Sequence, residues 1–188
     1  MIIPTEKMKD LSLVTEIMHD TIQMISHMSY EQIKAEVVAN DWTTNPNKPS
    51  YGNWNFSLYN KHWTIPELPE YMKTIQQKIE RIPDCFQSFV NFIRPNTILP
   101  KHMDDESSEG DMGTLKCAGI KCYQVSCGIV IPSLDPLYCG LDIDGTIVSH
   151  GIGEVIVFDG TKPHWGWNKT DSWRVTLIFD MYKTGFTN

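Results

Sequence analysis

The sequence predicts a mainly β fold, an antiparallel barrel or jelly roll buttressed by helices that precede the strands. Six short runs rich in β-branched and aromatic residues follow residue 86, and turn residues separate them. Asp144-Gly145, between two of these runs, is a dipeptide typical of tight hairpins. The helical patterns come first and do not alternate with the strands, which argues against a parallel βαβ sheet.

The length and composition predict a single domain with a well-filled core. The chain has 188 residues, of which 41% are hydrophobic and 11% aromatic. A chain of this size ordinarily forms one domain. We expect residues 1–53 to form a helical and loop extension, and residues 54–188 to form the jelly-roll core.

Two helices are predicted ahead of the main run of strands. Ser29 and Gln32 fit a capping box that opens a helix over 30–40. A second helix is predicted over 67–82, where apolar residues keep a 3.6-residue period before Pro83 ends it. Residues 41–55 are rich in Asn, Pro, Gly and Trp, and are expected to form a loop that enters a short strand over 55–60.

The remaining strands are predicted over 87–94, 121–132, 137–143, 146–150, 154–160 and 172–182. In the last of them Arg174 and Thr176 alternate with apolar residues, so they share one face of the strand. Gln124 and Ser126 share one face of the strand over 121–132 in the same way. Such polar residues either face solvent or line a polar cavity inside a small barrel, and the alternation leaves both alternatives open.

Charge and targeting signals exclude several classes of partner. The net charge is −7 with no basic run, so we expect no nucleic-acid partner. No apolar run approaches the roughly 18–20 residues that span a membrane, and the N-terminus does not resemble a signal peptide. The five cysteines are an odd number in a chain without an export signal, which predicts reduced thiols. We expect a soluble, cytoplasmic protein; the oligomeric state stays open.

Two histidines and an aspartate indicate a possible metal site. His102 and Asp104 lie two residues apart, so on a strand edge both side chains project to the same side. His164 is the candidate for a third ligand. Two histidines and one carboxylate on one face of an octahedral metal suit a non-haem Fe(II) that binds a co-substrate and then O2. Zinc more often takes three histidines or an HExxH helix, and the sequence has no such motif. Each element alone is weak, because His102 and Asp104 could lie in a surface loop and His164 could be an aromatic neighbour.

Arg174 strengthens this interpretation. It lies ten residues beyond His164, and two strands of a hairpin with that offset would bring the guanidinium near the metal but not onto it. There it could hold the remote carboxylate of a dicarboxylic acid, while a keto-acid group at the other end chelates iron. The other histidines, His19, His27, His62 and His150, lack evident partners and are interpreted as structural or exposed.

Residues 86–182 resemble the aspartyl/asparaginyl β-hydroxylase family of Fe(II)/2-oxoglutarate oxygenases. The matching stretches are FVNFIRPNTILPKH, GIVIP, GEVIVFDGTKPHWGWN and RVTLIFDMY, whereas the first forty residues give no support. The resemblance implies a double-stranded β-helix (cupin-like jelly roll) and an enzyme that hydroxylates an unactivated C–H bond of an amino acid or an aspartyl- or asparaginyl-type substrate, which could be a small molecule or a peptide.

The resemblance also assigns roles to single residues. His102 and His164 match the iron-binding histidines, Asp104 stands at the position of the carboxylate ligand, and Arg174 matches the arginine that binds 2-oxoglutarate. Asn91 falls where the family often has a serine that contacts this co-substrate. Gln124 and Ser126 replace an arginine and a histidine of the family pattern; both can still form hydrogen bonds, and we assign them to the co-substrate site.

Two alternatives remain. A cupin-like module could bind a metal or small molecule on the same fold without oxygenase activity, although it would not need Arg174. A degenerate interaction protein could also keep the fold. The acidic segment over 103–113 could be a substrate lid or a solvated connector.

Overall fold

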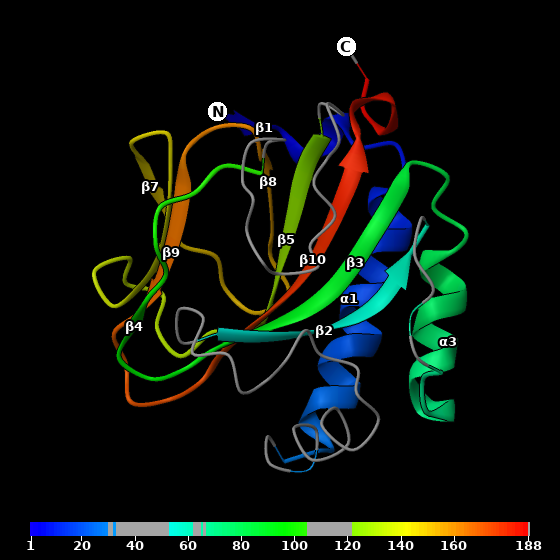
Figure 1. Cartoon of the computed structure of the whole chain (residues 1–188), viewed down its shortest axis with the longest axis horizontal. Coiled ribbons are helices and arrows are strands. Elements are labelled where there is room, and N and C mark those ends of the chain that lie inside the picture. Colours follow the sequence, from blue (N-terminus) through cyan, green and yellow to red (C-terminus); the bar gives the residue numbers. More distant parts are fainter. Residues whose placement is uncertain (30–31, 33–52, 62–64, 66, 105–121, 188) are drawn as a thin grey trace.

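The computed structural model describes residues 1–29, 32, 53–61, 65, 67–104 and 122–187, and these form two antiparallel sheets and two α-helices (Figure 1). The helical segments are η1 (Thr5–Lys7), α1 (Leu11–Ser26), α3 (Glu70–Ile79) and η2 (Lys183–Gly185). The strands are β1 (Ile2–Ile3), β2 (Asn53–Asn60), β3 (Cys85–Ile93), β4 (Thr97–Ile98), β5 (Cys122–Val130), β6 (Cys139–Ile143), β7 (Thr146–Val148), β8 (Val155–Asp159), β9 (His164–Asn168) and β10 (Arg174–Tyr182).

The strands form a jelly roll, as predicted. One sheet has the order β1-β8-β5-β10-β3-β2 and the other the order β4-β9-β6-β7. From β3 onward the chain passes from one sheet to the other and back, so strands that follow each other in sequence mostly belong to different sheets (Figure 1). The mainly β, double-stranded β-helix prediction is therefore confirmed.

The predicted hairpin between the strand at His164 and the strand at Arg174 is wrong. β9 pairs with β4 on one side and β6 on the other, whereas β10 pairs with β3 and β5 in the opposite sheet. Both edges of β9 are already hydrogen-bonded, so β10 cannot add to it. Arg174 and His164 therefore lie in opposite sheets and are not neighbours within one sheet.

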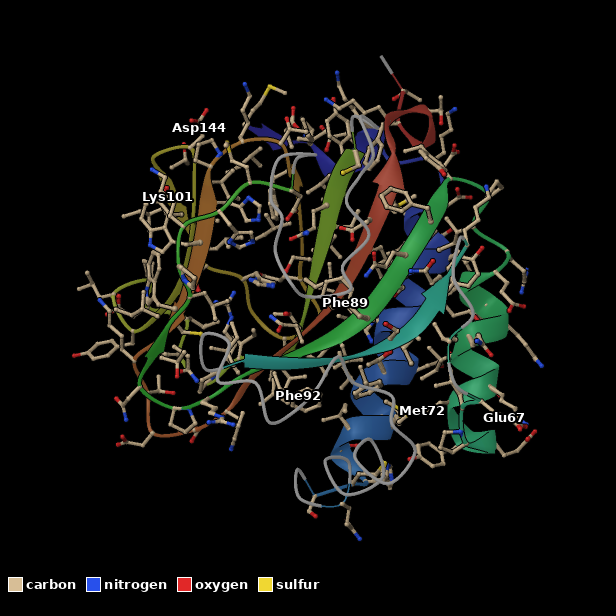
Figure 2. All side chains as sticks on the ribbon, viewed as in Figure 1. Glu67, Met72, Phe89, Phe92, Lys101 and Asp144 are labelled. Atoms are coloured by element: carbon tan, nitrogen blue, oxygen red, sulfur yellow. The ribbon has the colours of Figure 1, made fainter. Side chains whose placement is uncertain are left out.

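The tight turn at Asp144-Gly145 is confirmed. Ile143 and Thr146 pair across it, and the two turn residues take positive φ values of 54° and 85°. This backbone suits the twist of a two-residue hairpin, and the second position favours glycine. The Asp142 carboxylate accepts a hydrogen bond from the Gly145 N–H at 2.8 Å, which holds the turn labelled by Asp144 in Figure 2.

The helices match the predictions only in part. The second predicted helix is present as α3, which begins after Pro69 and buries Met72, Ile75 and Ile79. The helix α1 was not predicted, although Val14, Ile17 and Met18 have the spacing of a buried helical stripe. The helix predicted over 30–40 and the loop over 41–52 lie outside the described residues apart from Gln32, as does the acidic segment from 105 onward.

The capping box at the start of that helix is formed. The Ser29 N–H donates to Gln32 Oε1 at 2.8 Å, and the Gln32 N–H donates to Ser29 Oγ at 3.2 Å. These two reciprocal bonds satisfy backbone donors that a helix start leaves unpaired.

The six-stranded sheet has one layer of side chains on each of its two faces. Leu177 and Phe179 of β10 are buried in one core with Phe92 of β3 and Met72 of α3, on the side that α1 and α3 cover (Figures 1 and 2). The polar residues of β10 point the other way, toward the four-stranded sheet. Arg174 is only 3% exposed, and its Nη1 donates to the Gly140 carbonyl of β6 at 2.8 Å. The polar row therefore lies inside the jelly roll and does not face solvent.

The other sequence predictions on the described residues are simple to place. The cysteines at 85, 122, 127 and 139 are buried and unpaired by disulfides. Burial raises the pKa of the Cys127 thiol, so it stays protonated. Neither α1 nor α3 combines the length and the apolar character that crossing a membrane requires.

Candidate metal centre

The backbone brings His102 and His164 together. An antiparallel β-bridge joins them: the His102 N–H donates to the His164 carbonyl at 3.0 Å, and the His164 N–H donates to the His102 carbonyl at 2.9 Å. Residues paired in this way project their side chains to the same side of the ladder. The two imidazole rings accordingly lie with their centroids 4.3 Å apart.

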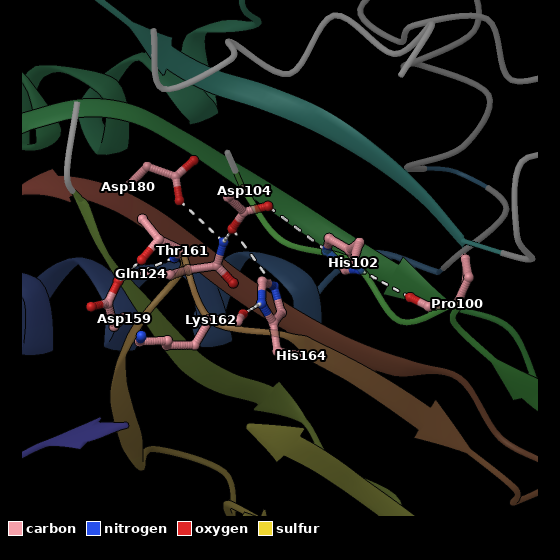
Figure 3. Close-up of polar contacts among 9 residues, drawn as sticks. All are labelled: Pro100, His102, Asp104, Gln124, Asp159, Thr161, Lys162, His164 and Asp180. Carbon is pink, nitrogen blue, oxygen red and sulfur yellow. Dashed lines mark hydrogen bonds and ion pairs between the residues drawn. The ribbon is translucent and has the colours of Figure 1, made fainter. Parts of the chain in front are cut away.

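Each of these rings is oriented by the same local contact. His102 Nδ1 lies 3.0 Å from the Pro100 carbonyl, and His164 Nδ1 lies 2.9 Å from the Lys162 carbonyl (Figure 3). A carbonyl accepts only, so each Nδ1 carries the proton and each Nε2 keeps its lone pair. This is the arrangement by which proteins fix the tautomer of a metal-binding histidine.

Asp104 completes the group. Its N–H donates to the Gly160 carbonyl at 2.9 Å, which places the carboxylate between the rings: Oδ1 lies 3.8 Å from His102 Nε2 and Oδ2 lies 3.6 Å from His164 Nε2 (Figure 3). Gly160 leaves the necessary room, because a Cβ there would lie 2.9 Å from Asp104 Oδ2. One ligand atom from each residue falls within 4.8 Å of the others.

The chemistry of this donor set fits a ferrous ion. Burial lowers the pKa of His164, more than the nearby Asp104 charge raises it, so the imidazole is neutral near neutral pH and able to bind a metal. Two imidazole nitrogens and one carboxylate on a single side match the facial triad of non-haem iron oxygenases, which leaves three coordination positions to other molecules. His102, Asp104 and His164 were predicted as this group, and the structure brings them together.

Gln124 lies beside the carboxylate ligand. Its Nε2 donates to Asp104 Oδ2 at 3.1 Å and to Asp180 Oδ1 at 3.2 Å (Figure 3). Burial, together with the Asp104 charge, raises the pKa of Asp180 to about 8. Gln124 was predicted to contact the co-substrate; its contacts in the structure are those of a residue that orients Asp104.

Arg174 is a buried cation whose ionic partner is missing from the described part of the chain. Nη1 donates to the carbonyls of Gly140 at 2.8 Å and Trp167 at 3.2 Å, whereas Nε is buried and has no acceptor. No carboxylate in the described residues forms an ion pair with it. Desolvation lowers the pKa of the guanidinium, which is the signature of a charge without compensation.

Glycine at 166 sets the distance between this cation and the triad. A Cβ there would lie 3.3 Å from Arg174 Nη1, so the guanidinium rests against β9 at this residue. His164 is two residues away along the same strand and on the same face, which corresponds to about 7 Å. The carbon chain of a five-carbon dicarboxylic acid spans a distance of this order.

The two remaining predicted co-substrate residues lie on the same inner face. Asn91 of β3 is in register with Thr176 of β10, and Ser126 of β5 is in register with Ile178. Ser126 Oγ lies 3.4 Å from His150 Nε2. His150 follows β7 and is only 2% exposed, which agrees with the structural alternative predicted for it and excludes the exposed one. The expectation that it lacks a partner is wrong, because Ser126 is one. No sequence signal marks it, because its contact is with a residue 24 positions away on another strand.

Comparisons with known proteins match most of the chain to one family model. The family model described as aspartyl/asparaginyl beta-hydroxylase matches residues 14–184. The match begins within α1 at residue 14 and includes most of that helix, so the prediction that the first forty residues lack family support is wrong. No curated protein sequence matches the chain.

Solved structures share the fold at low sequence identity. A 2OG-Fe(II) oxygenase family oxidoreductase from Burkholderia pseudomallei superposes with a TM-score of 0.50 at 12% identity, covering 86% of this chain and 83% of that one. A Pseudomonas putida prolyl-4-hydroxylase gives a TM-score of 0.46 at 14% identity, covering 80% of this chain and 84% of that one.

Proposed function

The chain belongs to the aspartyl/asparaginyl β-hydroxylase family, and from that premise we propose that it is an Fe(II)- and 2-oxoglutarate-dependent oxygenase. Its reaction would hydroxylate an unactivated C–H bond of an amino acid or of an aspartyl- or asparaginyl-type substrate. The observation that carries this proposal is the convergence of His102 Nε2, His164 Nε2 and the Asp104 carboxylate, each held by its own hydrogen bonds.

The proposed reaction assigns a separate role to each group of residues in the site. Bound iron with 2-oxoglutarate and O2 would supply the oxidative chemistry, in which one oxygen atom goes to succinate, formed with release of CO2, and the other is inserted into the C–H bond. His102, Asp104 and His164 would hold the metal without rearrangement, because their rings and carboxylate are already oriented. Gln124 keeps Asp104 aimed at the metal through its hydrogen bond.

Arg174 supports 2-oxoglutarate as the co-substrate. Its Nη1 protons are used by two carbonyls of the opposite sheet, so the Nε edge of the guanidinium remains for a ligand. A carboxylate at this edge would receive two parallel hydrogen bonds and neutralise a buried charge. A cupin-like binding module without oxygenase activity has no use for a buried cation without a partner, and this favours the oxygenase over that alternative.

The substrate is a separate question from the reaction. Gln124 and Ser126 replace a charged arginine and a histidine of the family pattern, so this strand presents less positive charge to an acidic substrate than that pattern would. A test must therefore include substrates of more than one kind, both free amino acids and aspartyl- or asparaginyl-containing peptides.

The experiment is anaerobic titration of the full chain with Fe(II) and then with 2-oxoglutarate, followed by admission of O2 in the presence of a substrate panel. The proposal expects one iron per chain, iron-dependent binding of 2-oxoglutarate, and succinate release that a substrate stimulates. Iron binding without any 2-oxoglutarate binding would favour the cupin-like module, and absence of iron binding would refute the oxygenase.

A further inference from the structure

His150 is held rigidly although it lies in the connection between β7 and β8. On one side of it, Ser149 Oγ donates to the Cys139 carbonyl at 2.8 Å. On the other side, the Gly151 N–H donates to Glu154 Oε2 at 2.8 Å. The connection can approach β5 closely because residue 128 is glycine: a Cβ there would lie 2.1 Å from the Gly151 carbonyl oxygen. These contacts fix the backbone on both sides of the imidazole.

The imidazole has one satisfied and one unsatisfied nitrogen. Nε2 lies 3.4 Å from Ser126 Oγ, whose hydroxyl can donate to it. Nδ1 is buried and has no hydrogen-bond partner among the described residues. With the serine hydroxyl donating to Nε2, the proton of the neutral ring resides on Nδ1, which leaves a buried N–H without an acceptor. An unpaired buried donor destabilises the ligand-free protein, and an acceptor on a bound ligand would remove that cost.

The same region contains a second unpaired donor. Arg174 Nε is also buried without an acceptor among the described residues. Adjacent contacts bring the two residues into one region: Arg174 Nη1 donates to the Gly140 carbonyl, and Ser149, next to His150, donates to the carbonyl of the preceding residue, Cys139. Burial, together with the Arg174 charge, lowers the pKa of His150 to about 3. The ring is therefore neutral and carries a single N–H. Two neighbouring donors, one of them cationic, suit an anionic acceptor with two oxygens, which is a carboxylate.

We propose that His150 is a co-substrate-positioning residue whose Nδ1–H donates to the remote carboxylate of 2-oxoglutarate beside Arg174. This inference rests on the proposed function. It also explains how Ser126 takes part in the site: the serine sets the tautomer of His150 and does not need to reach the co-substrate itself.

The test compares two variants of His150 in the iron-loaded, anaerobic full-length protein. Asn places its side-chain amide near the position of Nδ1 and can still donate, whereas Leu has a similar size and donates nothing. The dissociation constant for 2-oxoglutarate, measured by calorimetry, should rise about tenfold or more in His150→Leu and less than about threefold in His150→Asn. The dissociation constant for Fe(II) should stay unchanged in both, because His150 is not a metal ligand.

A matched ligand separates positioning from mere support of the fold. 2-Oxopentanoate has the same carbon chain and keto-acid end but lacks the remote carboxylate, so His150→Leu should bind it as well as the wild type does. Equal weakening for both ligands, or unchanged binding of 2-oxoglutarate in His150→Leu, would overturn the inference while leaving the oxygenase proposal in place. If the wild type itself binds iron but no 2-oxoglutarate, the proposed function fails and this inference fails with it.

Discussion

The two faces of strand β10 are equally buried but are stabilised in different ways. On the outer face, Leu177 and Phe179 are fully buried in the core that also contains the apolar residues of α1 and α3. On the inner face, Arg174 is 3% exposed, yet one of its guanidinium nitrogens has no acceptor. One face gains free energy by removing apolar surface from water, whereas the other loses part of that gain to unpaired polar groups.

This difference separates the residues that hold the fold from those that hold ligands. Apolar packing explains the outer face completely. Among the described residues, the interior beside the inner face of β10 contains a cation without a counter-ion (Arg174), a histidine with an unpaired nitrogen (His150) and a carboxylate whose pKa is raised to about 8 (Asp180). Groups of this kind cost stability in the ligand-free protein, and binding of a metal and an anion would offset that cost. The predictions below test whether the two faces are as separate as this comparison requires.

The largest effect is expected at the metal. His164→Ala removes a buried ligand and should weaken Fe(II) binding by more than about 100-fold, because even loss of a hydrogen-bond partner of a ligand typically costs 10–100-fold. Anaerobic iron titration measures this. His27→Ala, at an exposed histidine near the end of α1, is the matched control and should bind iron normally.

A substitution on the outer face should lower the stability of the protein without weakening Fe(II) binding. Leu177→Ala leaves a cavity in the core beneath the helices and should lower the free energy of unfolding by about 2–5 kcal/mol. Urea denaturation of the metal-free protein measures this loss. The Fe(II) affinity of the folded variant should stay within about threefold of the wild type. A parallel loss of metal affinity would show that the two faces are coupled.

Arg174→Met tests the proposed binding of the remote carboxylate of 2-oxoglutarate by the Arg174 guanidinium. Removing the guanidinium should raise the dissociation constant of 2-oxoglutarate about 100-fold, since a bidentate charged pair is lost. Calorimetry with the iron-loaded protein measures it. The Fe(II) affinity should not change, because Arg174 contacts no ligand of the triad. An unaltered 2-oxoglutarate affinity would remove the co-substrate assignment but leave the metal site.

Gln124→Met distinguishes two roles for one residue. If Gln124 orients Asp104, as its hydrogen bond indicates, the variant should bind Fe(II) about tenfold more weakly. Its affinity for 2-oxoglutarate, measured at saturating iron, should then change little. The reverse result, normal iron binding with weakened 2-oxoglutarate binding, would support the direct co-substrate contact predicted from the sequence.

The smallest effect concerns pH. Burial, together with the Arg174 charge, lowers the pKa of His150 from 6.5 to about 3. Below the ordinary pKa, the unfolded chain takes up a proton that the folded chain does not, so acid lowers the free energy of unfolding. Between about pH 6 and about pH 5, the wild type should lose about 1 kcal/mol more than His150→Asn does. Asp180, with its raised pKa, acts in the opposite direction, but it is present in both proteins and cancels in the difference. An equal change in the free energy of unfolding between these pH values in the two proteins, measured by urea denaturation, would contradict a buried neutral His150.

The sequence pointed to part of the candidate metal centre through local signals. His102 and Asp104 lie two residues apart, and the alternation around Arg174 places it on the polar face of its strand. The tight turn at Asp144-Gly145 is likewise encoded by two adjacent residues. Each of these features follows from strand periodicity or turn chemistry, which a single sequence displays directly. His164 had no local signal and entered only as a candidate third ligand and through the family resemblance.

The features that could not be predicted depend on contacts between distant segments. The sheet in which β9 and β10 lie is decided by which strands occupy their edges, and sequence spacing does not record this. The contact between His150 and Ser126 depends on the close approach of Gly151 to Gly128 across two strands. The alternation of β10 likewise could not distinguish solvent from an interior polar face, because only the position of the second sheet decides it.

The most direct test of the central claim is a crystal structure of the full chain with Mn(II), as a redox-stable substitute for Fe(II), and 2-oxoglutarate. The account predicts a metal bound by His102 Nε2, His164 Nε2 and the Asp104 carboxylate, with the remote carboxylate of the diacid at Arg174 Nε and His150 Nδ1. A metal bound by other side chains, or a diacid bound away from Arg174, would contradict it.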